Sequence, residues 1–261
     1  MNKSTIIYQV KQQVAKIRFN RPHRLNAVTE VFYSELLKAL QEAEDDPNVR
    51  SIILTGEGRA FCVGADMKEH DAGQRTAFQR REYLRGEQRV CKRLMTLSKP
   101  VIAALNGYAL GAGAEMAVAS DFIVMSESAE FGLPEVSIGT FIGGGVSKLL
   151  PQLVGMAKAR ELIYFGKRIS GEEAVNIGLA SKVFPDSTFT NDVNEFARQL
   201  AEKAPISMAL AKEHLLAGLT RSVDDALNAE LEAMAFCAAT KDWQEGIDAF
   251  TEKRPPLFTG K

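Results

Sequence analysis

The chain has 261 residues, of which 46% are hydrophobic and 25% charged, and its formal net charge is -1 at pH 7. This composition is typical of a globular protein with a sizeable core and excludes disordered and collagen-like classes. The near-zero charge gives no overall field toward nucleic acid or an anionic membrane.

The cysteine content and the hydropathy indicate the cellular compartment in which the protein is expected. Three scattered cysteines, Cys62, Cys91 and Cys237, favour free thiols in a reducing environment over a disulfide framework. No run of about 18 apolar residues is present to span a bilayer, so no membrane association is expected. The expected location is the cytoplasm, or the mitochondrial matrix if a presequence was removed.

Strand and helix signals alternate along the first part of the chain. Residues 6–19 hold two β-prone segments, and Thr29 is a candidate N-cap of an amphipathic helix that ends at 45–47. The segments SIILTG at 51–56 and VIAAL at 101–105 are almost wholly apolar, as in parallel strands covered on both faces. This order predicts a mixed α/β fold.

Two strand-to-glycine turns follow these apolar segments, FCVGADM at 61–67 and ALGAGAE at 109–115. Glycine lets the backbone approach a ligand closely and leaves the first N–H groups of a helix unobstructed. Both turns could therefore present N–H groups to one ligand atom. Glu115 ends the second turn in apolar surroundings, where a carboxylate without partners is costly. A functional role, a helix-dipole role and an exposed position all remain open for it.

A second carboxylate, Glu135, directly follows Pro134 in the segment AEFGLPEVSIGTFIGGG. The segment is otherwise apolar and ends in a further glycine-rich turn at 143–145. The alternative to a functional role is a turn residue in contact with water.

Residues 75–99 carry eight Lys and Arg residues on a predicted amphipathic helix. Such a helix could attract phosphates or RNA, although a solvated face is the favoured interpretation.

The pattern changes near residue 188, after which one helix follows another, with breaks at Pro205 and Ser222. We therefore expect two parts, a mixed α/β core over 1–190 that holds the site and an all-α region over 191–261.

Several chemistries lack their sequence motifs. There is no phosphate-binding loop, no dinucleotide fingerprint and no nucleophile elbow. A hard cation could use Asp66, Glu69, His70 and Asp71, but a polar loop explains them better, and no metal is expected. Two carboxylates and two glycine turns remain. They suit a reaction in which an oxyanion develops on a carbonyl while a carboxylate moves a proton or a water.

The segments FCVGADMKE, KPVIAALNGYALGAGAE and FGLPEVSIGTFIGGG resemble the three signature segments of the enoyl-CoA hydratase/isomerase (crotonase) superfamily. The resemblance extends from VAKIRFNRPHRLNAV to FTEKRPP, nearly the whole chain. It implies an α/β spiral of ββα repeats followed by a C-terminal helical trimerisation region, so that the chain would form homotrimers or dimers of trimers. It also implies an acyl-CoA thioester as substrate, with coenzyme A as part of the substrate and no separate cofactor.

The resemblance also implies roles for individual residues. The N–H groups of Ala65 and Ala112 would bind the thioester oxygen, although hydratases usually carry glycine at the second position. Glu115, ionised, would deprotonate a water for attack at C3, Glu135 would protonate C2, and the N–H of Gly143 would contact the water. Because simple isomerases of the family generally keep only the second carboxylate, the pair favours an enoyl-CoA hydratase.

For the coenzyme A portion, the resemblance points to a second group of residues. Phe61 to Val63 and Lys68 match positions near the adenine and phosphates, and Phe250 and Lys253 match positions that reach a neighbouring subunit's coenzyme A. Solvated surface charge is an equally supported role for the two lysines. The alternative activities are double-bond isomerisation and hydration of a specialised aromatic or alicyclic acyl-CoA. An RNA-binding or non-catalytic role is the remote alternative.

Overall fold

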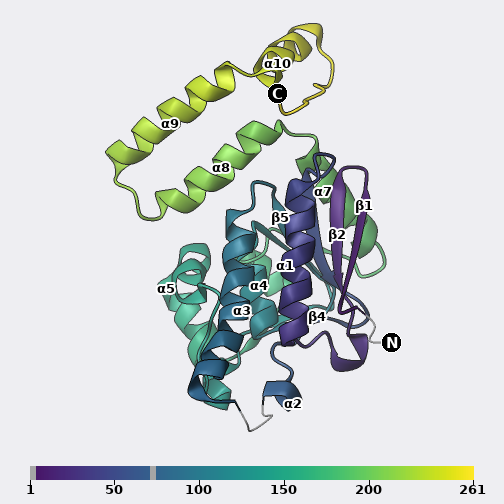
Figure 1. The fold of residues 1–261 in the computed structure, drawn as a ribbon, viewed down its shortest axis with the longest axis vertical. Coiled ribbons are helices and arrows are strands. Elements are labelled where there is room, and N and C mark those ends of the chain that lie inside the picture. The colour runs from purple at the N-terminus through teal and green to yellow at the C-terminus, as the bar shows by residue number, and fades with distance from the viewer. Residues whose placement is uncertain (1–3, 71–74) are drawn as a thin grey trace.

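The computed structural model describes residues 4–70 and 75–261 as an α/β core from which a group of helices extends (Figure 1). Among these residues, no helix is both long enough and apolar enough to cross a membrane.

A six-stranded sheet forms the centre of the core. Its first two strands pair antiparallel, and every later pairing is parallel. In spatial order the strands are β1 (Ile6–Lys11), β2 (Val14–Phe19), β3 (Ser51–Gly56), β5 (Val101–Leu105), β7 (Phe122–Ser126) and β10 (Lys182–Phe184).

A smaller sheet of four strands lies beside it and carries the turns of interest. Its strands are, in spatial order, β4 (Ala60–Cys62), β6 (Tyr108–Leu110), β8 (Glu130–Gly132) and β9 (Arg168–Ser170). In the pairs β3–β4, β5–β6 and β7–β8, the first strand joins the large sheet and the second the small one. A helix follows each pair: α3 (Ala77–Thr96), α4 (Ala112–Val118) and α5 (Val146–Phe165). This repetition confirms the predicted spiral of ββα units.

The large sheet is buried on both faces, as its apolar strands predicted. Ile52 and Leu54 of β3 face the main core with α1 (Glu30–Asp45), whereas Ile53 faces α7 (Phe189–Ala201) on the other side. The predicted N-cap is confirmed, because the Thr29 hydroxyl accepts a hydrogen bond of 3.1 Å from the backbone N–H of Phe32.

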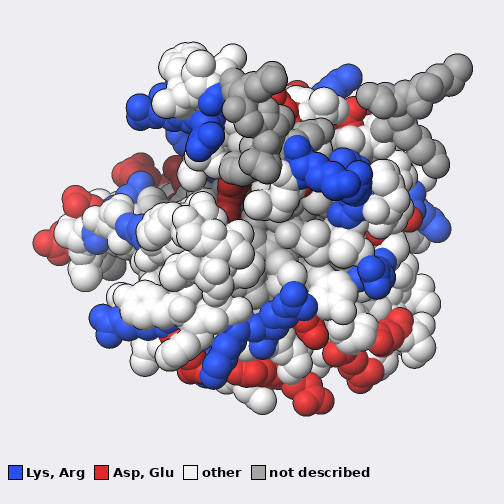
Figure 2. All heavy atoms as spheres, turned by 90° about the horizontal axis from the view of Figure 1, so that it is seen from below, with Lys and Arg blue, Asp and Glu red and all other residues white. Residues whose placement is uncertain are grey.

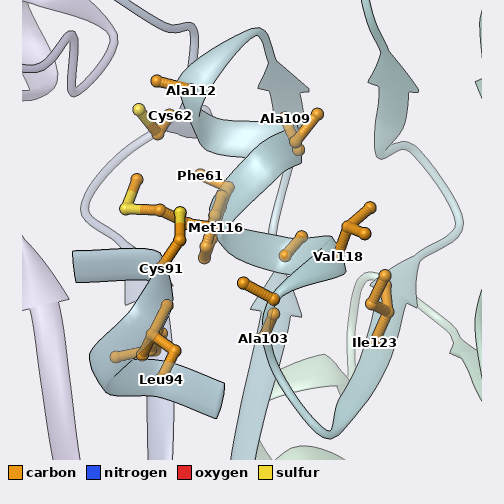
Figure 3. Close-up of a cluster of buried hydrophobic side chains, with 14 of the residues drawn as sticks. Phe61, Cys62, Cys91, Leu94, Ala103, Ala109, Ala112, Met116, Val118 and Ile123 are labelled. Carbon is orange, nitrogen blue, oxygen red and sulfur yellow. The ribbon is translucent and has the colours of Figure 1, made fainter. Parts of the chain in front are cut away.

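The short helix α4 is packed into the centre of the core. Its Met116 lies near Phe61 and Cys91, which come from β4 and α3 (Figure 3). A Cβ atom on Gly113 would lie only 2.1 Å from the carbonyl oxygen of Cys62, so this contact between α4 and β4 requires glycine. The remaining helices of the core are α2 (Met67–His70) and α6 (Gly171–Asn176), with 3-10 turns at Pro22–Arg24 (η1) and Glu135–Ile138 (η2).

Three further helices extend away from the core: α8 (Pro205–Gly218), α9 (Val223–Ala238) and α10 (Lys241–Glu252) (Figure 1). The buried ammonium group of Lys212 anchors α8, because it donates to the Leu94 carbonyl at 2.8 Å and pairs with Asp121 at 2.7 Å. The helix breaks predicted at Pro205 and Ser222 are confirmed. The expected division between residues 190 and 191 falls inside α7, a helix that packs on the large sheet.

Candidate active site

The two predicted glycine turns lie against each other. Gly64 and Gly111 have φ angles of 92° and 55°, in the region that favours glycine. A Cβ atom on Gly111 would lie 3.4 Å from the Cα of Gly64, and one on Gly64 would lie 3.5 Å from the backbone nitrogen of Ala112. Two turns that are separated along the chain therefore form one site.

Each turn contributes a backbone N–H at this contact. Ala65 forms an isolated parallel bridge with Val28, and the bonds of this bridge use the neighbours of Ala65: Val28 N–H donates to Gly64 and Asp66 N–H donates to Val28. The N–H of Ala65 itself consequently points away from Val28. Ala112 is the first residue of α4, so its N–H has no acceptor within the helix. The arrangement suits a carbonyl oxygen held by both groups.

Glu115 is buried in the first turn of α4, with 3% of its surface exposed. Its Oε1 accepts a hydrogen bond of 2.6 Å from the backbone N–H of Gly143. An exposed position is thereby excluded. The structure gives the N–H of Gly143 this carboxylate as its partner, which fixes the orientation of Glu115; its expected contact with a water stays a prediction.

Glu135 begins η2 and is 6% exposed, so the alternative of a solvated turn residue is wrong. Burial raises the pKa of its carboxyl group. Its Oε1 lies close to the glycine turns, because a Cβ atom on Gly111 would approach it to 3.2 Å. Its Oε2 is buried and has no hydrogen-bond partner among the described residues. This oxygen is available to a ligand or a water.

A third carboxyl group, that of Glu87 in α3, belongs to the same site and was not predicted. A Cβ atom on Gly143 would lie 2.9 Å from Glu87 Oε1 and 3.0 Å from Glu115 Oε2. Burial, together with the charge of Glu135, raises the pKa of Glu87 to about 7. The sequence signal was its spacing: Glu87 follows the buried Tyr83 by four residues and precedes the buried Val90 by three, on the inward face of the helix.

The residues predicted to bind coenzyme A are not all brought to this site. Phe61 is fully buried in the core against Phe19, so any contact with a ligand is restricted to its backbone. Val63 is partly buried beside the Gly64 turn, and Lys68 is exposed on α2. Phe250 is exposed on α10 and Lys253 caps that helix, both in the helical extension away from α4 (Figure 1).

The alternatives of a cation site and of an RNA-binding helix gain no support. Asp66 pairs with Arg21 at 2.9 Å, whereas Asp71 and the side chains of Glu69 and His70 lie outside the described part of the structure. Among the described residues, no group of acidic, His or Cys residues could hold a metal ion. On α3, the carboxylate of Glu82 pairs with Arg85 and Arg89. On the face shown in Figure 2, the Lys and Arg side chains form separate groups and not one continuous patch.

Comparison with known proteins defines the class. The sequence pattern of the family described as Enoyl-CoA hydratase/isomerase matches residues 9–261. A crystal structure of an enoyl-CoA hydratase from Bacillus anthracis has a TM-score of 0.94 at 37% identity, with 98% of this chain and 100% of that chain covered. The chain belongs to the enoyl-CoA hydratase/isomerase (crotonase) superfamily, in agreement with the resemblance found in its sequence.

Two similar proteins have narrower names. The Short-chain-enoyl-CoA hydratase of Clostridium acetobutylicum is 37% identical over 255 residues, which cover 97% of each chain. The Crotonyl-CoA hydratase of Syntrophomonas wolfei is 35% identical, with 98% of each chain covered.

Proposed function

We propose that the protein is an enoyl-CoA hydratase, which adds water across the double bond of a 2-enoyl-CoA thioester to give a 3-hydroxyacyl-CoA. The observation that carries the proposal is the presence of two buried carboxyl groups, Glu115 and Glu135, beside the paired glycine turns. Similar proteins named as hydratases of enoyl-CoA and crotonyl-CoA support the same reaction.

The glycine turns supply the electrophilic half of the reaction. The N–H groups of Ala65 and Ala112 hold the thioester oxygen and stabilise the negative charge that develops on it when C3 is attacked. Donors fixed in this way typically contribute about 3 to 4 kcal/mol each to stabilisation of a transition state. The folded backbone positions them before the substrate arrives, so no reorganisation is needed during the reaction.

The two carboxyl groups activate the water and transfer the protons. Glu115, oriented by Gly143, accepts a proton from the water as its oxygen forms the bond to C3. The electron pair of the C2–C3 double bond moves toward the thioester oxygen, and Glu135 then delivers a proton to C2. The raised pKa of Glu135 favours a protonated donor in this step. Proton exchange with solvent then returns Glu115 to its ionised form and Glu135 to its protonated form, so the net change is one water added and no redox change.

The direct test uses crotonyl-CoA. The purified protein is expected to remove its conjugated absorbance and to form 3-hydroxybutyryl-CoA. An unchanged absorbance at micromolar enzyme would contradict the proposal for short chains. A panel of 3-enoyl, aromatic and alicyclic acyl-CoAs, with products identified by mass spectrometry, separates hydration from the isomerase reaction that the family also includes.

The exposed apolar surface of the helical extension supports a homo-oligomer, a trimer or a dimer of trimers, as the arrangement of the active protein. Large apolar side chains project into solvent along all three helices, more than a monomer usually leaves uncovered. They include Leu215, Leu219, Val223, Leu227, Leu231, Met234, Trp243, Ile247 and Phe250. In such an assembly Phe250 and Lys253 of one subunit, with Val63 and Lys68 of the next, would line the coenzyme A site.

The free thiols support a reducing compartment, the cytoplasm or the mitochondrial matrix. Cys62 and Cys91 are buried without a disulfide, and Cys237 is also free.

A further inference from the structure

Glu87 is the least expected member of the site, because most charged side chains of α3 project outward. The helix buries Tyr83, Val90, Cys91 and Leu94 against the core. Glu87 occupies the same inward stripe, at the position where α3 passes the glycine turn that follows η2. An apolar residue at this position would simply continue the stripe.

One oxygen of the Glu87 carboxyl group has no hydrogen-bond partner among the described residues. This oxygen, Oε1, is buried. The charge that acts on it is that of another acid, Glu135, which is itself nine-tenths buried and keeps Oε2 without a partner. Two unpartnered carboxyl oxygens in one site are costly in the free protein, since a buried oxygen without a hydrogen bond loses about 1 to 3 kcal/mol. A ligand that supplies hydrogen-bond donors to these oxygens recovers this cost.

The position of Glu87 specifies which part of the substrate it meets. Its Oε1 and Glu115 Oε2 both lie close to Gly143, at 2.9 and 3.0 Å from the point that a Cβ atom on this glycine would occupy, so the two carboxyl groups are neighbours in the site. In the proposed reaction, Glu115 activates the water that attacks C3 of the acyl group. The next chain atom, C4, is bonded to C3 and therefore lies within reach of a group adjacent to Glu115.

We propose that Glu87 is a specificity-determining residue, which accepts a hydrogen bond from a hydroxyl group on C4 and selects 4-hydroxy-2-enoyl-CoA thioesters over unsubstituted 2-enoyl-CoA thioesters. The inference rests on the proposed hydratase function. A plain alkyl chain would cover the carboxyl group and leave it unpaired, whereas a C4 hydroxyl group would satisfy it. Sites built to hydrogen-bond a hydroxyl group discriminate against analogues that lack it.

The test compares kcat/KM for crotonyl-CoA and 4-hydroxycrotonyl-CoA in the full-length protein. The natural protein is expected to prefer the hydroxylated substrate by about tenfold or more, the effect of one hydrogen bond to a carboxyl group. Glu87→Leu should abolish the preference and raise kcat/KM for crotonyl-CoA, while Glu87→Gln, which keeps an acceptor oxygen, should retain part of it. Glu82→Leu, a change of the same kind on the outer side of α3, is the matched control and should leave the ratio unaltered.

Two results would overturn the inference while leaving hydration in place. One is an equal substrate ratio in the natural protein and in Glu87→Leu. The other is an equal loss of kcat on both substrates in Glu87→Gln, because that pattern places Glu87 in the reaction itself. Failure of the natural protein to hydrate either substrate would instead overturn the proposed function, and with it this inference. Thermal unfolding of each variant verifies that the fold is kept.

Discussion

The spiral core around α4 and the helical extension formed by α8 to α10 use their apolar and glycine residues in opposite ways. In the core, a Cβ atom on Gly113 would meet a backbone oxygen at 2.1 Å, and every side chain of α4 is buried. In the extension, a Cβ atom on Gly218 would meet nothing within 4 Å, and no residue of α9 is buried. The core is completed by its own chain, whereas the extension presents an apolar surface that a second copy would cover.

The largest expected effect is on the reaction in the core. Glu115→Gln and Glu135→Gln should each lower kcat for crotonyl-CoA by roughly 100- to 10,000-fold, because each removes a group that transfers a proton. Turnover is measured by the loss of absorbance, with circular dichroism to monitor the fold. The exposed Glu127→Gln is the control and should leave kcat near that of the natural protein. Near-normal kcat in both site variants would show that the buried carboxyl groups take no part in catalysis.

The second prediction introduces charged residues into the exposed apolar surface of the helical extension. Leu227→Asp with Leu231→Asp on α9 should reduce the mass in solution from a multiple of 28.6 kDa to 28.6 kDa, because aspartate is poorly tolerated in an apolar interface. Light scattering after size-exclusion chromatography measures this. Asp224→Asn, at the start of the same helix, is the control for a change of charge alone. A natural protein that is already monomeric would remove the proposed role of the extension.

A pair of glycine substitutions compares the packing of the two regions directly. Gly113→Ala should lower the free energy of unfolding by roughly 3 kcal/mol, since the added methyl group overlaps the backbone of β4. Gly218→Ala has open space and should instead raise it by roughly 0.5 to 1 kcal/mol, because alanine loses less conformational freedom. Urea unfolding at fixed protein concentration gives both values. Effects of the same sign and size would contradict the difference in packing.

The last prediction concerns the pH dependence of stability in the core. The pKa of Glu87 is near its usual 4.5 when unfolded and about 7 when folded, so the folded protein binds the proton more tightly between these values. The unfolding free energy of the protein should consequently fall as pH rises from 4.5 to 7, by on the order of 1 to 3 kcal/mol. Urea unfolding of the natural protein and of Glu87→Gln at pH 5 and 7.5 isolates this contribution. A pH dependence that is identical in both proteins would exclude the raised pKa.

The sequence was most informative where a local pattern fixes local structure. Apolar segments predicted β3 and β5, Thr29 predicted the start of α1, and Pro205 and Ser222 predicted breaks between helices, all confirmed by the structure. These features depend on neighbours a few residues apart, through backbone hydrogen bonding and capping. The glycine turns and the carboxylates Glu115 and Glu135 were also visible, because they interrupt otherwise apolar segments.

Contacts between distant segments could not be predicted in the same way. Gly143 donates to Glu115 across 28 residues, and Glu87 meets both on a helix whose composition indicated a solvated basic face. Phe61 similarly lies in a segment associated with coenzyme A but packs wholly into the core. Burial of a side chain depends on which elements pack together, and composition averages over the two sides of a helix.

The sequence by itself determined the α/β class and, through the resemblance of its three signature segments, the superfamily. It also singled out Glu115 and Glu135 as candidates, because a carboxylate in an apolar segment is costly without a partner. Only the tertiary structure decided that the turns at Gly64 and Gly111 touch, and that a third carboxyl group faces the others. The physical reason is that hydrogen bonds and charge interactions act over a few ångströms, and the fold alone sets which distant residues come within that range.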